Sequence, residues 1–289
     1  MATQAKIGII GGSGLYQMEA LTSLHEVRVN TPFGEPSDAI LVGLLDGLPV
    51  AFLPRHGRGH RVSPSDMPNR ANIYALKSLG VERIISVSAV GSLKEELRPL
   101  DMVVPDQLID RTNGRASTFF QGGVAVHVAF ADPFCPTLSQ LLFQASQEVM
   151  EGRAHEGGTY IVIEGPAFST KAESALYRSW GASIIGMTAL PEAKLAREAE
   201  VCYSILASVT DYDCWHPEHA FVSVDMVIEN LKQNIESAQA VLRRVLPRIT
   251  QDRRCQCASA LKNAIVTAPA HIGQTAQHDL GILIQKYLN

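Results

Sequence analysis

Residues 6–14 read Lys-Ile-Gly-Ile-Ile-Gly-Gly-Ser-Gly, an apolar run that passes directly into a glycine-rich loop. A short apolar run bounded by glycine is typical of a strand that is buried on both faces of a sheet. Similar runs recur along the chain, at residues 50–53, 83–87, 101–104, 160–163, 183–187 and 204–209. We therefore expect the first strand to be one of several that share a single buried sheet.

Helical patterns lie between several of these runs. The clearest is Val224–Val245, where apolar side chains recur at intervals of three and four residues. Shorter helical patterns lie at residues 69–79, 171–180 and 191–198. Alternation of strands and helices predicts an α/β fold: a single domain with a central mixed, largely parallel sheet flanked by helices. We assign this domain to residues 1–247 and expect residues 248–289 to form a divergent C-terminal tail packed on the same domain.

Composition narrows the class of protein. The 289 residues carry a net charge of −4, with 46% hydrophobic and 19% charged residues, which is ordinary for a compact domain. This balance favours neither a nucleic-acid groove nor a membrane surface. The N-terminus lacks the pattern of a secretory signal, and no apolar run approaches the roughly 20 residues that span a bilayer. We expect a cytoplasmic protein with no nucleic-acid or membrane partner.

The five cysteines, an odd number at irregular spacing, argue against a secreted disulfide framework. Cys255 and Cys257 form a Cys-x-Cys pair with no His-rich segment near them, so the sequence predicts no metal site. The pair is open to two interpretations, a local disulfide or two inert thiols.

The loops that follow the apolar runs carry the candidate chemistry, because ligands of such sheets bind where the strands end. The first is glycine-rich and contains Ser13, so its backbone N–H groups can approach an anion. The second places Arg55 and His56 directly after a strand, and both side chains suit a phosphate-like dianion. The third offers Ser88 and Ala89 in a run of small residues. Together these loops indicate an anion site.

Three further loops suggest a planar organic ligand. Phe168 and Ser169 follow one strand, and an aromatic ring there can stack on a base. Met187 ends another and can line a sugar or thioether pocket. Asp211 and Asp213 follow the last strand with no Lys or Arg near them in sequence, and two such carboxylates are costly to bury unless hydrogen bonds or a ligand satisfy them.

The order of longer motifs is more specific than any of these loops alone. The stretches GGSGLY, PRHGRGH, SAVGSLKEEL, ADPFCP, IEGPAFST, MTALPEAKLAREA and SVTDYDCW occur in this order, together with TPFGEPSDA and QLIDRT. The chain thereby resembles the methylthioadenosine phosphorylase family of the trimeric purine nucleoside phosphorylases, from about Ile7 to Val245. The departures include Ala167 for Arg, Val90 for Cys, and Gly186 where Asn often precedes the methionine.

The resemblance implies the nucleoside phosphorylase fold, a homotrimer with active sites near subunit boundaries, and roles for particular residues. Phosphate, a co-substrate in an enzyme without a cofactor, would contact Ser13, Arg55, His56, Ser88, Ala89 and Thr188. The nucleoside would contact Phe168, Ser169, Met187, Asp211, Asp213 and Val224, with His127 reaching the methylthio pocket from a neighbouring subunit. Asp211 would be the catalytic acid at purine N7.

These roles predict phosphorolysis of S-methyl-5′-thioadenosine, with a methylthioinosine or 6-oxopurine nucleoside phosphorylase as the alternative within the family. A nucleosidase would differ in using water instead of phosphate. A dinucleotide-binding oxidoreductase is disfavoured because the full Gly-x-Gly-x-x-Gly spacing is absent after Gly14-Leu15-Tyr16. A ligand-binding protein without catalysis would not need both the anion contacts and the base contacts.

Overall fold

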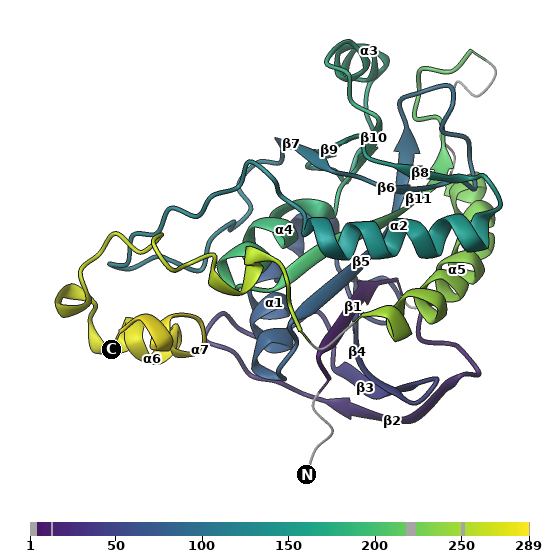
Figure 1. Cartoon of the computed structure of the whole chain (residues 1–289). Coiled ribbons are helices and arrows are strands. Elements are labelled where there is room, and N and C mark those ends of the chain that lie inside the picture. Colours follow the sequence, from purple (N-terminus) through teal and green to yellow (C-terminus); the bar gives the residue numbers. More distant parts are fainter. Residues whose placement is uncertain (1–4, 13, 218–223, 250–251, 289) are drawn as a thin grey trace.

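The computed structural model describes residues 5–12, 14–217, 224–249 and 252–288, and the side chains of residues 224–229 lie outside that description. The strands are β1 (Ile7–Gly11), β2 (Leu21–Val27), β3 (Ile40–Leu45), β4 (Leu48–Pro54), β5 (Arg83–Ser92), β6 (Met102–Val104), β7 (Gln107–Arg111), β8 (Ala154–Glu156), β9 (Thr159–Ile163), β10 (Ile184–Gly186) and β11 (Cys202–Asp211). The main helices are α1 (Asn69–Ser78), α2 (Pro136–Met150), α3 (Lys171–Ser179), α4 (Ala189–Glu198) and α5 (Val224–Val245) (Figure 1).

All the strands belong to one mixed sheet, as the alternation of elements predicts. Parallel pairs join β1 to β4 and β5, and β5 to β11. Antiparallel pairs lie at the periphery, where β3 pairs with β2 and β4. The sheet branches at β5, whose far end also pairs with β10. Because β1, β4, β5 and β11 run in parallel, their carboxyl ends meet at one edge of the sheet.

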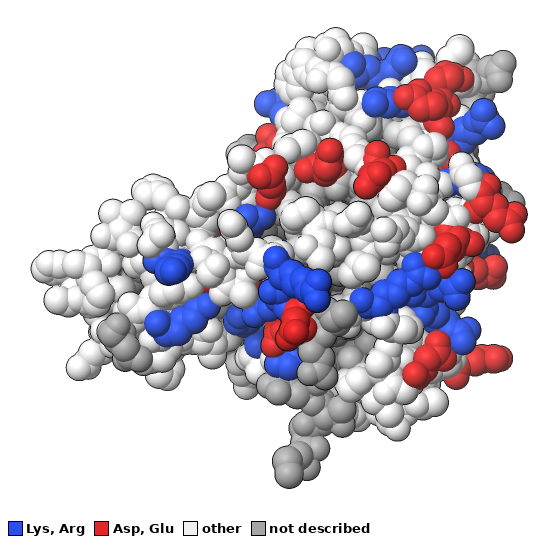
Figure 2. Space-filling view, in the orientation of Figure 1, with Lys and Arg blue, Asp and Glu red and all other residues white. Residues whose placement is uncertain are grey.

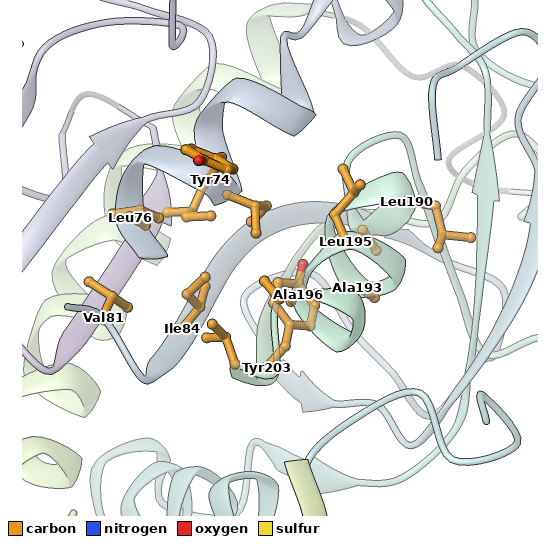
Figure 3. Packing of buried hydrophobic residues seen from close by; sticks show 14 of the residues in the cluster. Tyr74, Leu76, Val81, Ile84, Leu190, Ala193, Leu195, Ala196 and Tyr203 are labelled. Carbon is orange, nitrogen blue, oxygen red and sulfur yellow. The ribbon is translucent and has the colours of Figure 1, made fainter. Parts of the chain in front are cut away.

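Two apolar layers enclose the sheet, one on each face. Helices α1 and α4 cover one face, and α2 and α5 cover the other. Successive strand residues therefore face different layers, as Ile84 and Ile85 of β5 do. Figure 3 shows the first layer, in which side chains of α1 and α4 surround Ile84 and Tyr203. Burial on both faces explains why these strands are continuous apolar runs in the sequence.

The predicted strands and helices are present, with changes at their ends. Helix α4 begins at Ala189 instead of residue 191, and β5 extends to Ser92. The sequence patterns did not identify β2, β3, β7, β8 or α2. Strand β2 is mostly exposed and carries polar residues at most positions, so it lacks the apolar signal of a buried strand.

The C-terminal tail packs against α1 and the loop around residue 126. It contains α6 (Gln274–Asp279), α7 (Gly281–Ile284), and the short 3-10 helices η3 (Gln256–Ser259), η4 (Pro269–His271) and η5 (Gln285–Tyr287). Leu261 and Ile284 of the tail lie in the same buried cluster as α1, and Val126 forms an antiparallel bridge with Ile265. The boundary of the main domain at residue 247 stays a prediction.

Charges of both signs are interspersed on the face of the molecule that Figure 2 shows. Within the described ranges, every helix is too short or too polar to cross a bilayer.

Buried Glu200 fastens the tail to the domain. Its Oε1 accepts hydrogen bonds from the backbone N–H of Leu261 at 3.0 Å and from the hydroxyl of Tyr287 at 2.5 Å. Its Oε2 forms an ion pair with Lys286. The Glu200 side chain is only 3% exposed, so these contacts are shielded from water.

We expect Glu200→Ala to lower the free energy of unfolding by about 3 kcal/mol, because it leaves buried donors without an acceptor. Urea denaturation measures the change. Glu148→Ala is the matched control, since Glu148 forms two ion pairs at the surface, with Arg244 and Arg248, and its loss should change stability far less. Equal effects of the two substitutions would contradict this role of Glu200.

Candidate active site

A cleft lies at the edge of the sheet where the parallel strands end. It consists of two connected cavities of about 230 and 200 Å³. Both are lined by His56, His60, Ala89 and Thr188, so they are two ends of one cleft. We call them the carboxylate end, around Asp211, and the arginine end, around Arg55.

The arginine end brings together residues from separate segments of the chain, among them Arg55 and His56 at the end of β4. Gly12 and Gly14 follow β1, Ser88 and Ala89 lie in β5, and Thr188 precedes α4. The hydroxyls of Ser88 and Thr188 are 2.8 Å apart. Every predicted phosphate residue except Ser13 therefore lies here, and Ser13 falls outside the described residues.

Arg55 is fully buried behind this end and is held by an ion pair. Its Nε and Nη2 contact the two oxygens of Glu192 at 2.5 and 3.2 Å. Nη2 also donates to Ser86 Oγ at 2.6 Å, and Nη1 donates to the Val87 carbonyl at 3.0 Å. Because the two-pronged edge of the guanidinium is occupied by Glu192, one N–H of Nη1 remains for a ligand. Arg55 therefore makes its bidentate contact with the Glu192 carboxylate, and that edge of the guanidinium cannot also bind an anion.

His56 is neutral in this setting. Burial, with a smaller contribution from the nearby Arg55 charge, lowers its pKa to about 4. Its Nδ1 lies 2.8 Å from the Val62 carbonyl, which can only accept, so Nδ1 carries the proton. The neutral ring then has an unprotonated Nε2, which can accept a hydrogen bond from a protonated phosphate oxygen.

Two buried carboxylates define the other end. Asp211 and Asp213 are 7% and 4% exposed, and neither has an ion-pair partner in the part of the chain that is described. Asp211 accepts hydrogen bonds from Thr210 Oγ1 at 2.7 Å and from the Asp213 backbone N–H at 2.8 Å. Burial raises the pKa of both carboxyl groups above the ordinary value. A Cβ at Gly91 would lie 2.9 Å from Asp211 Oδ1, so glycine is needed at this close approach.

The remaining predicted contacts line the same end. Phe168 is half exposed at its mouth, and Ser169 Oγ is buried without a hydrogen-bond partner in the described structure. Met187 lines it as well. The departure at Gly186 has a steric reason, since a Cβ there would lie 2.3 Å from the Tyr160 hydroxyl. Tyr160 thus occupies the space that an asparagine would need.

Helix α5 closes the arginine end on one side. Leu231, Asn234 and Ile235 line the cavity, and Asn234 Nδ2 donates to the Val209 carbonyl at 3.0 Å. This apolar helix face continues the stripe that begins at Val224, whose side chain lies outside the described part of the chain. His127 is exposed and is not among the lining residues of this cleft.

Sequence reasoning missed three residues of the cleft. Glu192 was part of a quoted motif, but nothing in the sequence links it to Arg55, 137 residues away. Ser208 lies within a buried strand, and its Oγ lines the cleft without a hydrogen-bond partner in the described structure. Asn234 is a polar residue in the long helical stripe, and its place on an otherwise apolar face is the signal that would have found it.

The fold and the cleft together define a class of protein. A mixed α/β sheet whose strand ends place a buried arginine and two adjacent hydroxyls beside two desolvated carboxylates is typical of enzymes of the nucleoside phosphorylase type. The family model described as the phosphorylase superfamily matches residues 6–247.

Comparison with known proteins narrows the class. The S-methyl-5′-thioadenosine phosphorylases of Gloeobacter violaceus and Geobacter sulfurreducens are each 56% identical to this chain, covering 98% of it and 96% and 99% of the relatives. A solved methylthioadenosine phosphorylase from an Antarctic soil metagenomic library has a TM-score of 0.93 at 52% identity, covering 96% of this chain and 98% of its own. The Schistosoma mansoni enzyme in complex with adenine has a TM-score of 0.83 at 36% identity, covering 89% and 96%. The chain belongs to the S-methyl-5′-thioadenosine phosphorylase family of the phosphorylase superfamily.

The buried setting of His56 predicts its titration. We expect its ring to stay neutral until the pH falls to about 4, whereas an unperturbed histidine titrates near ~6.5. NMR of ¹³C-labelled histidine measures this midpoint, and His56→Gln assigns the resonance by removing it. A midpoint close to the ordinary value would contradict the burial of the ring.

Proposed function

We propose that this chain catalyses the phosphorolysis of S-methyl-5′-thioadenosine to adenine and 5-methylthioribose 1-phosphate. The observation that carries the proposal is the single cleft that joins an anion-binding end to a pair of buried carboxylates. The membership of the family and the names of the similar proteins support the choice of substrate.

The reaction follows from the two ends of the cleft. A phosphate oxygen, held by Ser13, Arg55, His56, Ser88, Ala89 and Thr188, forms a bond to C1′ while the C1′–N9 bond breaks. The sugar becomes oxocarbenium-like in the transition state, and the phosphate anion beside it stabilises the positive charge. The electron pair of the broken bond passes to the purine, which takes up a proton at N7.

Asp211 is the proposed source of that proton. Its raised pKa increases the fraction of the neutral acid, which is the form that can donate. Asp211 and Asp213 together accept hydrogen bonds from the 6-amino group of adenine, and the Phe168 ring and Ser169 complete the contacts with the base. A 6-oxo group would place an acceptor opposite these carboxylates, so the arrangement favours adenine over hypoxanthine.

The 5′ group would lie between apolar side chains. Met187 contacts the ribose, and Val224 with the following turns of α5 surrounds the methylthio group. Leu231 and Ile235 of those turns already line the cavity. An apolar pocket of this kind discriminates a methylthio group from a hydroxyl by about 10- to 200-fold.

We further propose a homotrimer in which His127 reaches the methylthio pocket of a neighbouring subunit. In support, His127 is exposed, and its backbone N–H is fixed to the tail by a 2.8 Å hydrogen bond to the Ala264 carbonyl. Sedimentation velocity tests the trimer. The enzyme would act in the cytoplasm and need no cofactor besides its co-substrate, inorganic phosphate.

Incubation of the purified protein with S-methyl-5′-thioadenosine, with and without inorganic phosphate, tests the reaction. We expect adenine and 5-methylthioribose 1-phosphate only when phosphate is present. Adenine release without phosphate would identify a nucleosidase and contradict the anion site. Cleavage of methylthioinosine alone would contradict the proposed role of the two carboxylates while preserving the phosphate site.

Asp211→Asn removes the acidic group of the side chain and keeps nearly the same shape. The amide cannot supply a proton of comparable acidity, so we expect kcat for the adenine nucleoside to fall by about 100-fold or more. The relative preference for 6-oxopurine nucleosides should rise, because the amide can donate to a 6-oxo group. The ratio of kcat/KM for methylthioadenosine to that for methylthioinosine measures the change. Asp46→Asn, a matched change at a surface aspartate that pairs with Arg243, serves as control, and an unchanged ratio in Asp211→Asn would contradict the assignment.

A further inference from the structure

Four of the five cysteines meet at one point of the fold. The sulfur atoms of Cys135, Cys202, Cys255 and Cys257 all lie within 4.8 Å of one another. The sulfur atoms of Cys202 and Cys255 are 3.3 Å apart. None of the five cysteines is in a disulfide. Cys255 and Cys257 alone predict no metal site, because only the fold brings the other two cysteines beside them.

Three separate segments bring these sulfurs together. Cys202 begins β11, and Cys135 caps the start of α2. The backbone N–H of Cys135 donates to the Tyr203 carbonyl at 2.9 Å, which fixes the start of α2 beside the start of β11. Cys255 and Cys257 come from the tail, at the short helix η3, which passes beside this end of α2 (Figure 1).

The tail is held in place independently of the sulfurs. Arg253, two residues before Cys255, donates to the Glu200 carbonyl at 2.9 Å and forms an ion pair with Glu82 at 3.6 Å. The cysteine side chains are therefore positioned by the surrounding backbone. Cys135, Cys202 and Cys257 are 2%, 1% and 7% exposed, so the cluster is nearly closed to water.

The electrostatic surroundings favour negative sulfur. The small cavity next to the cluster is lined by Arg83, Arg253 and Arg254, with Asp252 as its acidic residue. Guanidinium groups near a cysteine favour the thiolate, which is the form that binds metal ions. A tetrathiolate site for a divalent ion carries two net negative charges, which these cations offset only in part, because Glu82 also pairs with Arg83 and Arg253.

We propose that Cys135, Cys202, Cys255 and Cys257 bind one zinc ion as a structural tetrathiolate site. Zinc takes four sulfur ligands tetrahedrally at about 2.3 Å, which places neighbouring sulfurs about 3.8 Å apart. The separations here, from 3.3 Å up to 4.8 Å, bracket that value. Four sulfurs this close to one another match a single ion with all four positions filled by protein, so the site would hold no open position for catalysis.

The ion would fasten the tail to the domain. Its ligands come from the start of β11, from the residue before α2 and from the tail, so removing it takes away one link between the tail and each of two elements. Binding requires loss of the thiol protons, and the binding free energy adds to the stability of the folded chain.

Metal analysis of the full chain, purified under reducing conditions without chelators, tests the site. We expect about one zinc per chain, with four sulfur ligands, and release of the zinc in step with thiol modification by a mercurial reagent. Replacement by cobalt(II) should give thiolate charge-transfer bands and the intense visible absorption of a tetrahedral ion. These measurements use the wild-type protein and do not depend on the folding of a variant.

Substitutions locate the ligands. Cys135→Ser and Cys255→Ser should each reduce the zinc content by roughly tenfold or more. Cys214→Ser is the matched control, because Cys214 is the fifth cysteine and lies outside the cluster, and it should retain full zinc. Full zinc in Cys255→Ser would overturn the proposal.

Two results for the wild type would also overturn it. One is a chain that holds less than about 0.1 zinc both as purified and after incubation with zinc under reducing conditions. The other is an intact mass about four units lower than the sequence predicts, because two disulfides would then have replaced the four thiols.

Discussion

The buried ion pair of Arg55 and Glu192 fixes the geometry on which the cleft depends. Arg55 follows β4, Glu192 lies in α4, and the guanidinium also contacts Ser86 and Val87 of β5. Tyr203 of β11 donates to Glu192 Oε2 at 2.8 Å. One network thus joins three strands and a helix behind the arginine end, and removing one partner of such a pair typically costs about 3–5 kcal/mol. The pair therefore positions the strand ends more than it supplies charge to a ligand.

Burial shifts the pKa values of the titratable groups of the cleft in opposite directions, but in each case it favours the neutral form. It lowers the pKa of His56 and raises the pKa of Asp211 and Asp213. Each group is thereby shifted toward its neutral form, while the charges of Arg55 and Glu192 offset each other. Most of the net charge in such a cleft therefore comes from the ligands that bind there. A phosphate anion would then meet little competing charge, and its field would act on the sugar with little screening by water.

Local patterns in the sequence predict the centre of this fold and the loops of its site. Strands such as β1 and β11 are buried on both faces, so their apolar runs are unambiguous. The same rule fails for β2, which is exposed and polar. It also fails for contacts between distant residues, because the pairing of Arg55 with Glu192 and the meeting of the four cysteines depend on the tertiary arrangement. The sequence identified His56 and Asp211, but the direction in which burial shifts each pKa required the packing around them.

Strand β11 illustrates how one element serves two purposes. Its 10 residues, at about 3.3 Å each, separate Cys202 from Asp211 by roughly 30 Å. The carboxyl end meets the ligand loops, as in other α/β sheets, whereas the amino end lies among the tail and the start of α2. A metal ion at the amino end would be too distant to take part in the chemistry and could act only through the rigidity of the strand and the tail. Because the tail also fixes the backbone of His127 through Ala264, its anchoring would bear on the proposed contacts between subunits more directly than on the carboxylates.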